Sequence, residues 1–234
     1  MNITDKSKAR RNLTIKKNLL KMIEKRGYEL GNEEDVLSIH DEHVYAKFMD
    51  NLASSYEREH GEPYPQYYNF YINNNCEPPQ LLLAIFGYQD ASNTQKIGKD
   101  FIEKIINIYE QYSALCAEII IIIDAPLSPK AEGTLSYITD VKWQVFKEED
   151  IIYVPIEYIY YSKHELVPKS EVKELLRTLG VTKNKLPLIY DTDPIVKYYN
   201  WDAGEIVRIY RDDSSINVLT PESVQYRLIV KCNK

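Results

Sequence analysis

His164 and Glu165 open the stretch HELVPK and match the first half of a zinc-protease signature. That signature, H-E-x-x-H, needs a second imidazole one helical turn later, so that two nitrogens bind one zinc ion while the glutamate activates its water. Pro168 occupies the second position, and proline neither ligates a metal nor continues a helix. The sequence therefore predicts no zinc site here.

A second candidate metal site is His40-Asp41-Glu42-His43, which offers four possible ligands within one turn. Imidazoles at i and i+3 on an acidic, exposed helix start are more typical of solvated side chains than of a metal centre. We expect no metal ion and no cofactor. We also expect no catalytic residue, apart from a nuclease alternative described in the next paragraph.

An enzyme alternative stays open. Asp124 at a strand end, followed after a gap by Asp140-Val141-Lys142, has the order of a PD-(D/E)xK-type nuclease. In such a site two carboxylates hold Mg²⁺ and a lysine assists the attacking water. D-x-K triplets are common in a lysine-rich chain, so this match is weak.

Two further stretches are candidates for nucleic-acid contact. Ser128, Pro129 and Lys130 could offer a hydroxyl, a backbone N–H and an ammonium group to phosphates, which position a duplex without reading its sequence. The aromatic residues Tyr67, Tyr68, Phe70 and Tyr71 could stack on bases, but no basic residues interleave them. For the aromatic residues, packing in the fold is the favoured interpretation.

The elements that must position these residues follow from periodicity and turn signals. The first 155 or so residues are predicted to form an α/β unit, with a loop at 124–133 beyond the carboxyl end of a central strand, where ligands usually meet open α/β sheets. The helices are expected at 8–26, closed by Gly27, at 41–56 and at 94–112; buried strands are expected at 81–86 and 119–123.

After Tyr161 the pattern changes to a small α+β unit. Ser170 is expected to cap a short helix closed by Gly180, and Asp193-Pro194 to start another, with Ile195, Val196 and Tyr199 facing inward. The stretches GEIVRIYR and VQYRLIV alternate apolar residues with arginine and are expected to pair as a hairpin.

Composition excludes some classes of protein. No apolar run approaches the roughly 20 residues that cross a bilayer, and no secretory signal is present, so we expect a protein that stays inside the cell. The three cysteines are far apart, which predicts neither a disulfide framework nor a zinc ribbon.

The net charge of −6 argues against a protein that coats nucleic acid, but the charges are segregated. Residues 1–30 hold nine Lys/Arg against three acids, and residues 31–62 hold nine acids against two basic residues. Two solvated, mutually offsetting helix faces are one interpretation, and a basic helix facing DNA or an acidic partner is the other.

The C-terminal third resembles a known family. HELVPK is followed, in order, by a leucine-rich helix, Leu186-Pro187, Asp193-Pro194, Gly204-Glu205, Arg211 and the YRL at 226–228. This series resembles the C-terminal domain of the archaeal RNA polymerase H subunit and of its eukaryotic counterpart, the fifth subunit shared by polymerases I, II and III. The resemblance spans residues 163–231.

The N-terminal part resembles the jaw domain that eukaryotic members add. The matching residues are the basic first helix ending in Arg26-Gly27-Tyr28 and the loop 127–131, which stands where a family loop lies near downstream DNA. The resemblance implies a nuclease-like α/β jaw at 1–158 and an α+β assembly domain at 162–234. It also places Ser128, Pro129 and Lys130 near DNA.

What the resemblance implies is a non-catalytic subunit of a DNA-directed RNA polymerase that docks on the largest subunit, contacts other subunits and lines the path of downstream duplex DNA. A free-standing adaptor remains a further alternative. The residues expected at the partner surface are His164, Glu165, Leu166, Val167, Pro168, Lys169, Asp193, Pro194, Gly204, Arg211, Tyr226 and Arg227.

Departures from the family pattern suggest a divergent partner surface. Asp202-Ala203 and Asp212-Asp213 stand where cellular members carry basic residues, LPLI lacks the basic residue that commonly follows LP, and the turn SSINVLTPES has no glycine. These features suggest the polymerase of a large DNA virus. The expected location is the nucleus for a cellular protein, and the host cytoplasm or the virion for a viral one.

Overall fold

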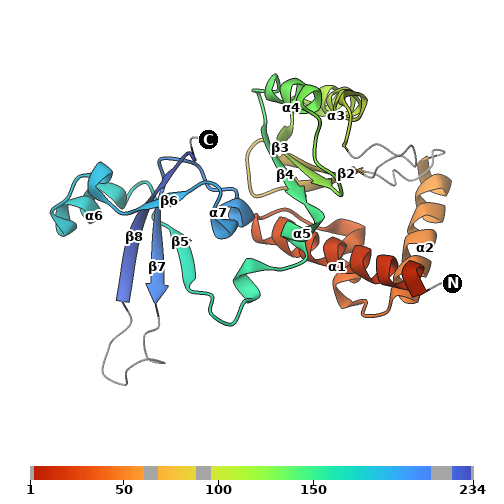
Figure 1. The fold of residues 1–234 in the computed structure, drawn as a ribbon, viewed down its shortest axis with the longest axis horizontal. Helices are drawn as coiled ribbons and strands as arrows, with labels where there is room; N and C mark the ends of the chain where they lie inside the picture. The colour runs from red at the N-terminus through yellow and green to blue at the C-terminus, as the bar shows by residue number, and fades with distance from the viewer. Residues whose placement is uncertain (1–2, 61–67, 88–95, 212–222, 233–234) are drawn as a thin grey trace. The chain divides into compact units, whose positions relative to one another are not determined.

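The computed structural model describes residues 3–60, 68–87, 96–211 and 223–232. The chain divides into two compact units, unit 1 (Met1–Tyr153) and unit 2 (Val154–Lys234). Figure 1 traces both from the red N-terminal helix to the blue C-terminal strand. Tyr67, Asp212-Asp213 and most of the turn SSINVLTPES lie outside the described residues.

Unit 1 is built on a four-stranded sheet with the order β1-β2-β3-β4. β1 and β2 pair antiparallel, and β2, β3 and β4 run parallel. The isoleucine run of β3 is buried on both faces, as is typical of a strand covered by helices on both sides. The strands are β1 (Tyr68–Asn73), β2 (Gln80–Gly87), β3 (Cys116–Ile123) and β4 (Lys142–Lys147).

Helices cover both faces of this sheet. Figure 1 shows α3 and α4 on one face and α1 on the other. The α3 and α4 side holds a core that includes Leu83, Ile105, Ile121 and Leu135. The helices are α1 (Ile3–Lys25), α2 (Glu42–His60), α3 (Lys99–Tyr112), α4 (Pro129–Ser136) and α5 (Glu148–Ile151), with the 3-10 helix η1 at Gly31–Ser38.

Local signals in the sequence predicted the end of α1 correctly but placed the start of α3 too early. Gly27 has a φ of 92°, and the N–H groups of Gly27 and Tyr28 donate to the carbonyls of Glu24 and Ile23, which forms a Schellman motif. The predicted end of α1 is confirmed. The helix predicted at 94–112 is shorter, because Gly98 is extended and α3 begins at Lys99.

The loop predicted at 124–133 is wrong from Pro129 onward. The Ser128 hydroxyl accepts a hydrogen bond from the Ala131 N–H at 3.2 Å, and Pro129 occupies the first helical position. The stretch SPKAE is therefore the start of α4. Serine followed by proline is itself a helix-start signal, which outweighs the loop-forming tendency of the prolines and glycine around it.

Unit 2 holds a four-stranded sheet with the order β5-β7-β8-β6. β7 pairs antiparallel with both β5 and β8, which confirms the predicted hairpin, and β6 runs parallel to β8. The strands are β5 (Lys163–Leu166), β6 (Leu188–Tyr190), β7 (Ile206–Arg211) and β8 (Ser223–Val230). The helices are α6 (Val172–Leu179) and α7 (Pro194–Tyr199), with 3-10 turns η2 (Pro155–Glu157) and η3 (Lys183–Lys185).

Each face of the unit 2 sheet packs on one helix. Val207, Ile209 and Ile229 join Val196 of α7 in one cluster, and Ile206 and Leu228 join the apolar residues of α6 in the other. We call these the α7 face and the α6 face. The observed fold of the chain is thus an α/β unit followed by a small α+β unit.

Of the two helix caps predicted in unit 2, the one at Asp193 is confirmed and the one at Ser170 is wrong. Asp193 Oδ1 accepts from the Ile195 N–H at 2.9 Å, as predicted. Ser170 does not cap α6, because the N-cap position is Glu171 and no side chain caps it. Gly180 closes α6 with a φ of 65°, as predicted. In α7 the deeply buried aromatic residue is Tyr198 rather than Tyr199.

Candidate assembly and nucleic-acid surfaces

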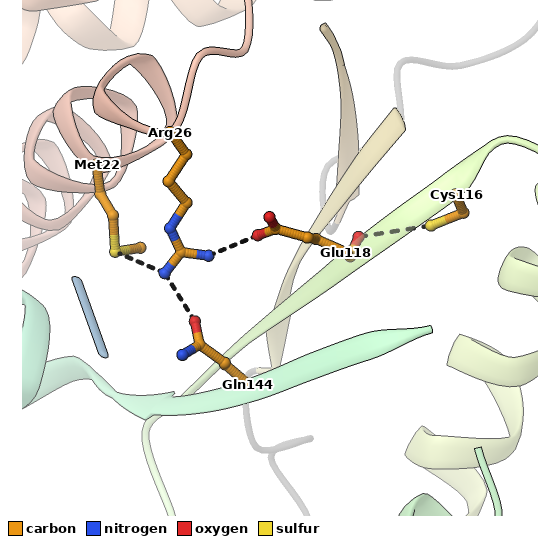
Figure 2. Close-up of polar contacts among 5 residues, drawn as sticks. All are labelled: Met22, Arg26, Cys116, Glu118 and Gln144. Atoms are coloured by element: carbon orange, nitrogen blue, oxygen red, sulfur yellow. Dashed lines mark hydrogen bonds and ion pairs between the residues drawn. The ribbon is translucent and has the colours of Figure 1, made fainter. Parts of the chain in front are cut away.

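Arg26, from the motif Arg26-Gly27-Tyr28, is a structural residue. Figure 2 shows its guanidinium between α1 and the sheet, donating to Glu118 of β3 at 2.8 Å and Gln144 of β4 at 2.7 Å. Its side chain is 2% exposed. A planar donor with several N–H groups suits such a divided contact. Arg26 therefore fastens the end of α1 to two strands.

Two other cations of α1 have similar roles. Arg11 pairs with Glu148 at 2.9 Å, and buried Lys16 pairs with buried Glu33 of η1 at 2.7 Å. Tyr71 of β1 contacts both members of the buried pair through its hydroxyl. Burial lowers the pKa of Lys16, and the Glu33 carboxylate opposes this. Part of the basic N-terminal charge thus holds α1 in the fold.

Ser128 and Lys130 lie at the start of α4, close to the carboxyl edge of the sheet. Ser128 is half-buried, since its N–H donates to the Ile97 carbonyl at 2.9 Å and its hydroxyl caps the helix. Pro129 and Lys130 are exposed. The capping hydroxyl keeps its proton available as a donor, so an anion there could meet a hydroxyl, a helix N-terminus and an ammonium group.

The strand register separates the residues of the nuclease alternative. Lys142 pairs with Glu118 at the beginning of β3, whereas Asp124 follows Ile123 at its end, beside Lys147. Five residue steps of a strand span about 17 Å. One Mg²⁺ ion binds its oxygen ligands at about 2.1 Å, so Asp124 and the Asp140-Val141-Lys142 segment cannot share it in this fold.

The other candidate stretches of unit 1 have structural roles. Asp41 caps α2 by accepting from the N–H groups of His43 and Val44, and both histidines are exposed. Phe70 packs on Tyr112 with ring centroids 4.4 Å apart, and Tyr71 is buried. No cluster of three or more His, Cys, Asp or Glu side chains suited to a metal ion occurs among the described residues.

His164 lies on β5, an edge strand of the unit 2 sheet. Its backbone N–H donates to the Tyr161 hydroxyl at 3.1 Å, its ring stacks on the Tyr161 ring, and its Nδ1–H donates to the Ser162 carbonyl. Burial lowers the pKa of His164, and the hydrogen bond to Ser162 opposes this shift. The histidine therefore holds the chain that leads into β5.

Glu165 belongs to a polar network on the α6 face. Its carboxylate accepts from the Tyr210 hydroxyl at 2.8 Å and pairs with Lys163 at 2.6 Å, and both contacts lower its pKa. Arg208, directly across the strand pair, donates to Tyr210 and Glu171 and lies over the Tyr226 ring. Sequence reasoning missed Arg208 and Tyr210, although their alternation along GEIVRIYR places them on one face.

The predicted partner residues are spread over both faces of the unit 2 sheet and over the connections between its strands. Strand pairing places His164, Leu166, Arg211 and Arg227 on the α7 face, and Glu165 and Tyr226 on the α6 face. The remaining residues lie on the connections between strands. Val167 is buried, Pro168 and Lys169 are exposed in the turn before α6, Asp193 and Pro194 start α7, and Gly204 turns with a φ of 93°.

No helix in the described part of the chain is long and apolar enough to cross a membrane.

Comparison with known proteins places this architecture in one functional class. The family model described as RNA polymerase Rpb5, C-terminal domain, matches residues 154–229. DNA-directed RNA polymerase subunit Rpo5 of Archaeoglobus fulgidus is 41% identical over 85 residues, covering 36% of this chain and 97% of the relative.

Eukaryotic relatives extend the match into unit 1. The subunit rpabc1 of RNA polymerases I, II and III from Dictyostelium discoideum is 28% identical over 141 residues, or 59% of this chain and 68% of that protein. The Caenorhabditis elegans RPABC1 is 22% identical over 224 residues, or 92% of this chain and 94% of that protein.

These relatives are all subunits of DNA-directed RNA polymerases, which assigns the chain to transcription. Within that class the chain belongs to the Rpb5 family, which includes archaeal subunits named Rpo5 and eukaryotic subunits named RPABC1.

Proposed function

We propose that the chain is a non-catalytic subunit of a multisubunit DNA-directed RNA polymerase. Unit 2 docks on the largest subunit and contacts other polymerase subunits, and unit 1 is a jaw with a nuclease-like fold beside downstream duplex DNA. The observation that carries the proposal is the match over nearly the whole length of an archaeal polymerase subunit. The separation of Asp124 from Lys142 supports a jaw without nuclease activity.

The proposed DNA contact is the start of α4. Ser128, Pro129 and Lys130 stand at a loop edge of the sheet, where an exposed ammonium group lies next to a capped helix N-terminus. Such groups bind phosphates without reading sequence, so downstream DNA retention should weaken with salt.

Affinity purification of the tagged chain from its native source tests the assignment. We expect two very large chains in equal amounts, together with RNA synthesis on a DNA template. Recovery of the chain alone, or with unrelated proteins, would favour a free-standing adaptor and remove the polymerase assignment.

A charge reversal tests the DNA contact. Lys130→Glu should lower downstream DNA retention by the assembled polymerase while the subunit stays bound, and Lys47→Glu on α2 serves as a matched exposed control. Loss of the subunit from the complex would show that α4 contributes to assembly instead. Incubation of the purified chain with Mg²⁺ and duplex DNA checks the nuclease alternative, and cleavage abolished by Asp124→Ala would restore it.

The location follows from the type of polymerase. For a cellular enzyme we propose the nucleus, and for a viral enzyme the host cytoplasm or the virion. Two of the departures that support a viral origin lie within the described residues. One is Asp202-Ala203, both exposed beside the turn at Gly204, and the other is LPLI at 186–189, which lacks the basic residue.

A further inference from the structure

Among the residues that the structure describes, β5 and β6 are the two edge strands of the unit 2 sheet, because the strand order is β5-β7-β8-β6. An edge strand presents backbone N–H and C=O groups that can pair with another strand, and proteins usually block such edges with charge or with a covering side chain. The two edges of this sheet differ in that respect.

The β5 edge is closed by its own chain. The Tyr161 hydroxyl accepts the His164 backbone N–H at 3.1 Å, and the two rings stack with centroids 5.7 Å apart. Lys163 and Glu165 form an ion pair along the same strand. A strand approaching β5 would have to displace Tyr161 and desolvate two charges.

The β6 edge is open. The Leu228 N–H donates to the Pro187 carbonyl and the Asp191 N–H to the Val230 carbonyl. In this parallel register Ile189 directs both of its backbone groups toward β8, so Leu188 and Tyr190 direct theirs away from it. The Tyr190 carbonyl accepts from the Asp193 N–H, which leaves the N–H and C=O of Leu188 and the N–H of Tyr190 facing outward.

The side chains of the open edge are apolar and exposed. Leu188 is 49% exposed and Tyr190 is 53% exposed, and their register with Leu228 and Val230 places both on the α6 face. β6 has the sequence LIY and carries no charged residue. The β6 edge offers outward backbone donors and two exposed apolar side chains. Such an edge suits an added strand as its binding partner better than it suits a globular protein surface or a small molecule.

Charges at both ends of β6 select among possible added strands. Lys183 and Lys185 precede it, and Lys231 follows the β8 residue that pairs with Tyr190; all three are exposed. The carboxylates nearest the far end, Asp191 and Asp193, accept from the N–H groups of Cys232 and Ile195. The Lys183 and Lys185 end of β6 would attract the carboxylates of an acidic segment, whereas the far end carries Lys231 together with two aspartates.

We propose that an extended, acidic segment of another polymerase subunit adds to the free edge of β6 as a fifth strand of the unit 2 sheet. The inference rests on the proposed function. Backbone bonds to Leu188 and Tyr190 hold the segment, its apolar side chains cover those two residues on the α6 face, and its carboxylates lie near the flanking lysines.

The first test compares subunit retention in the purified polymerase. Leu188→Lys should lower retention at least tenfold, while Val224→Lys, at a position 43% exposed on the same face but outside the part of β8 that pairs with β6, should leave it unchanged. Equal unfolding midpoints of both variants in the free chain show that the fold is intact. Unchanged retention of Leu188→Lys overturns the inference and leaves the proposed function standing, whereas absence of the wild-type chain from polymerase removes both.

The second test reads the backbone itself. Amide hydrogen exchange at Leu188 and Tyr190 should be fast in the free chain and at least a hundredfold slower in the polymerase. Leu188→Pro removes the outward N–H together with the leucine side chain, at an edge position where proline is tolerated, and should lower retention as well. Amides that stay fast in the complex overturn the strand addition, as does a free chain that sediments as a dimer through this edge.

Discussion

Replacing Arg26 by methionine tests how α1 is fastened to the sheet of unit 1. The change keeps an unbranched side chain beside Met22 and removes the hydrogen bonds to Glu118 and Gln144. The Glu118 carboxylate then loses its cation in a site where its side chain is only 17% exposed. We expect unit 1 to be destabilised while unit 2 is unaffected.

The magnitude follows from the two lost contacts. A hydrogen bond to a charged group contributes about 1.5–3 kcal/mol, and breaking a buried ion pair costs about 3–5 kcal/mol. Because water reaches Glu118 in part, the lower end applies, and the free energy of unfolding of unit 1 should fall by about 3 kcal/mol. With a urea dependence of about 2 kcal/mol per molar, the midpoint should fall by about 1.5 M.

The two tryptophans make the assay specific to each unit. Trp143 lies in β4 of unit 1, and Trp201 follows α7 in unit 2. In a Trp201→Phe background, urea unfolding followed by fluorescence reports unit 1 alone. The same measurement with Trp143→Phe reports unit 2 and serves as the internal control.

A double variant separates the loss of the pair from the loss of packing. Arg26→Met combined with Glu118→Leu leaves no uncompensated charge, and replacing a buried pair by apolar side chains is often nearly neutral. The double variant should therefore recover most of the lost stability. A midpoint shift below about 0.5 M for the single variant, or a double variant no more stable than the single one, would refute the reasoning.

Three further predictions concern caps, glycines and pH. Asp193→Ala should destabilise unit 2 by about 1 kcal/mol through loss of the α7 cap, whereas Ser170→Ala should leave it unchanged; urea midpoints check both. Gly180→Ala should cost about 1 kcal/mol because its φ is 65°, while Gly133→Ala, in a helix with open space at the Cβ position, should stabilise unit 1 by about 0.5–1 kcal/mol. The pKa of His164 is lowered in the folded protein, so the unfolded chain binds its proton first, and unit 2 should lose stability as pH falls below about 6.5. His164→Gln should remove that part of the pH dependence in urea unfolding measured from pH 8 to 5.

Local signals in the sequence were sufficient to predict a helix end or start where the backbone geometry requires one particular residue type. Gly27 and Gly180 end helices at positive φ, and Asp193 supplies the acceptor that opens α7. The apolar runs of β2 and β3 were equally clear, because strands buried on both faces need nearly continuous apolar sequence. These features could be predicted without knowledge of the neighbouring elements.

Competing local signals explain the errors. At Ser128 the stretch is rich in proline and glycine, which favours a loop, yet serine followed by proline is also the start of a helix, and α4 forms. At Ser170 the residue type suits a cap, but the turn from Pro168 to Glu171 places the helix start one residue later. One-residue differences of this kind depend on how the preceding segment packs.

Ion pairs between distant parts of the chain could not be predicted from the sequence. Arg26 and Glu118 are far apart in the chain, as are Lys16 and Glu33, and nothing in their surroundings in the sequence couples them. The same applies to the nuclease alternative, in which the order of Asp124 and Lys142 matched a motif. Only the parallel register of β3 and β4 shows that the two residues lie at opposite ends of the strands.

The stretch HELVPK shows why a family signature need not be a contact surface. His164 closes the β5 edge, Glu165 anchors the polar network on the α6 face, and Val167 is buried against α6. Most of these side chains are therefore occupied within unit 2. We propose that the partner binds mainly outside the signature, at Leu188 and Tyr190, which are exposed apolar residues on the edge strand β6. If the partner binds at the β6 edge, Leu188→Lys should lower retention of the subunit in the polymerase more than Lys169→Glu does. Lys169 is exposed and lies in the signature. The reverse order of effects in the retention assay would place the partner on the signature itself.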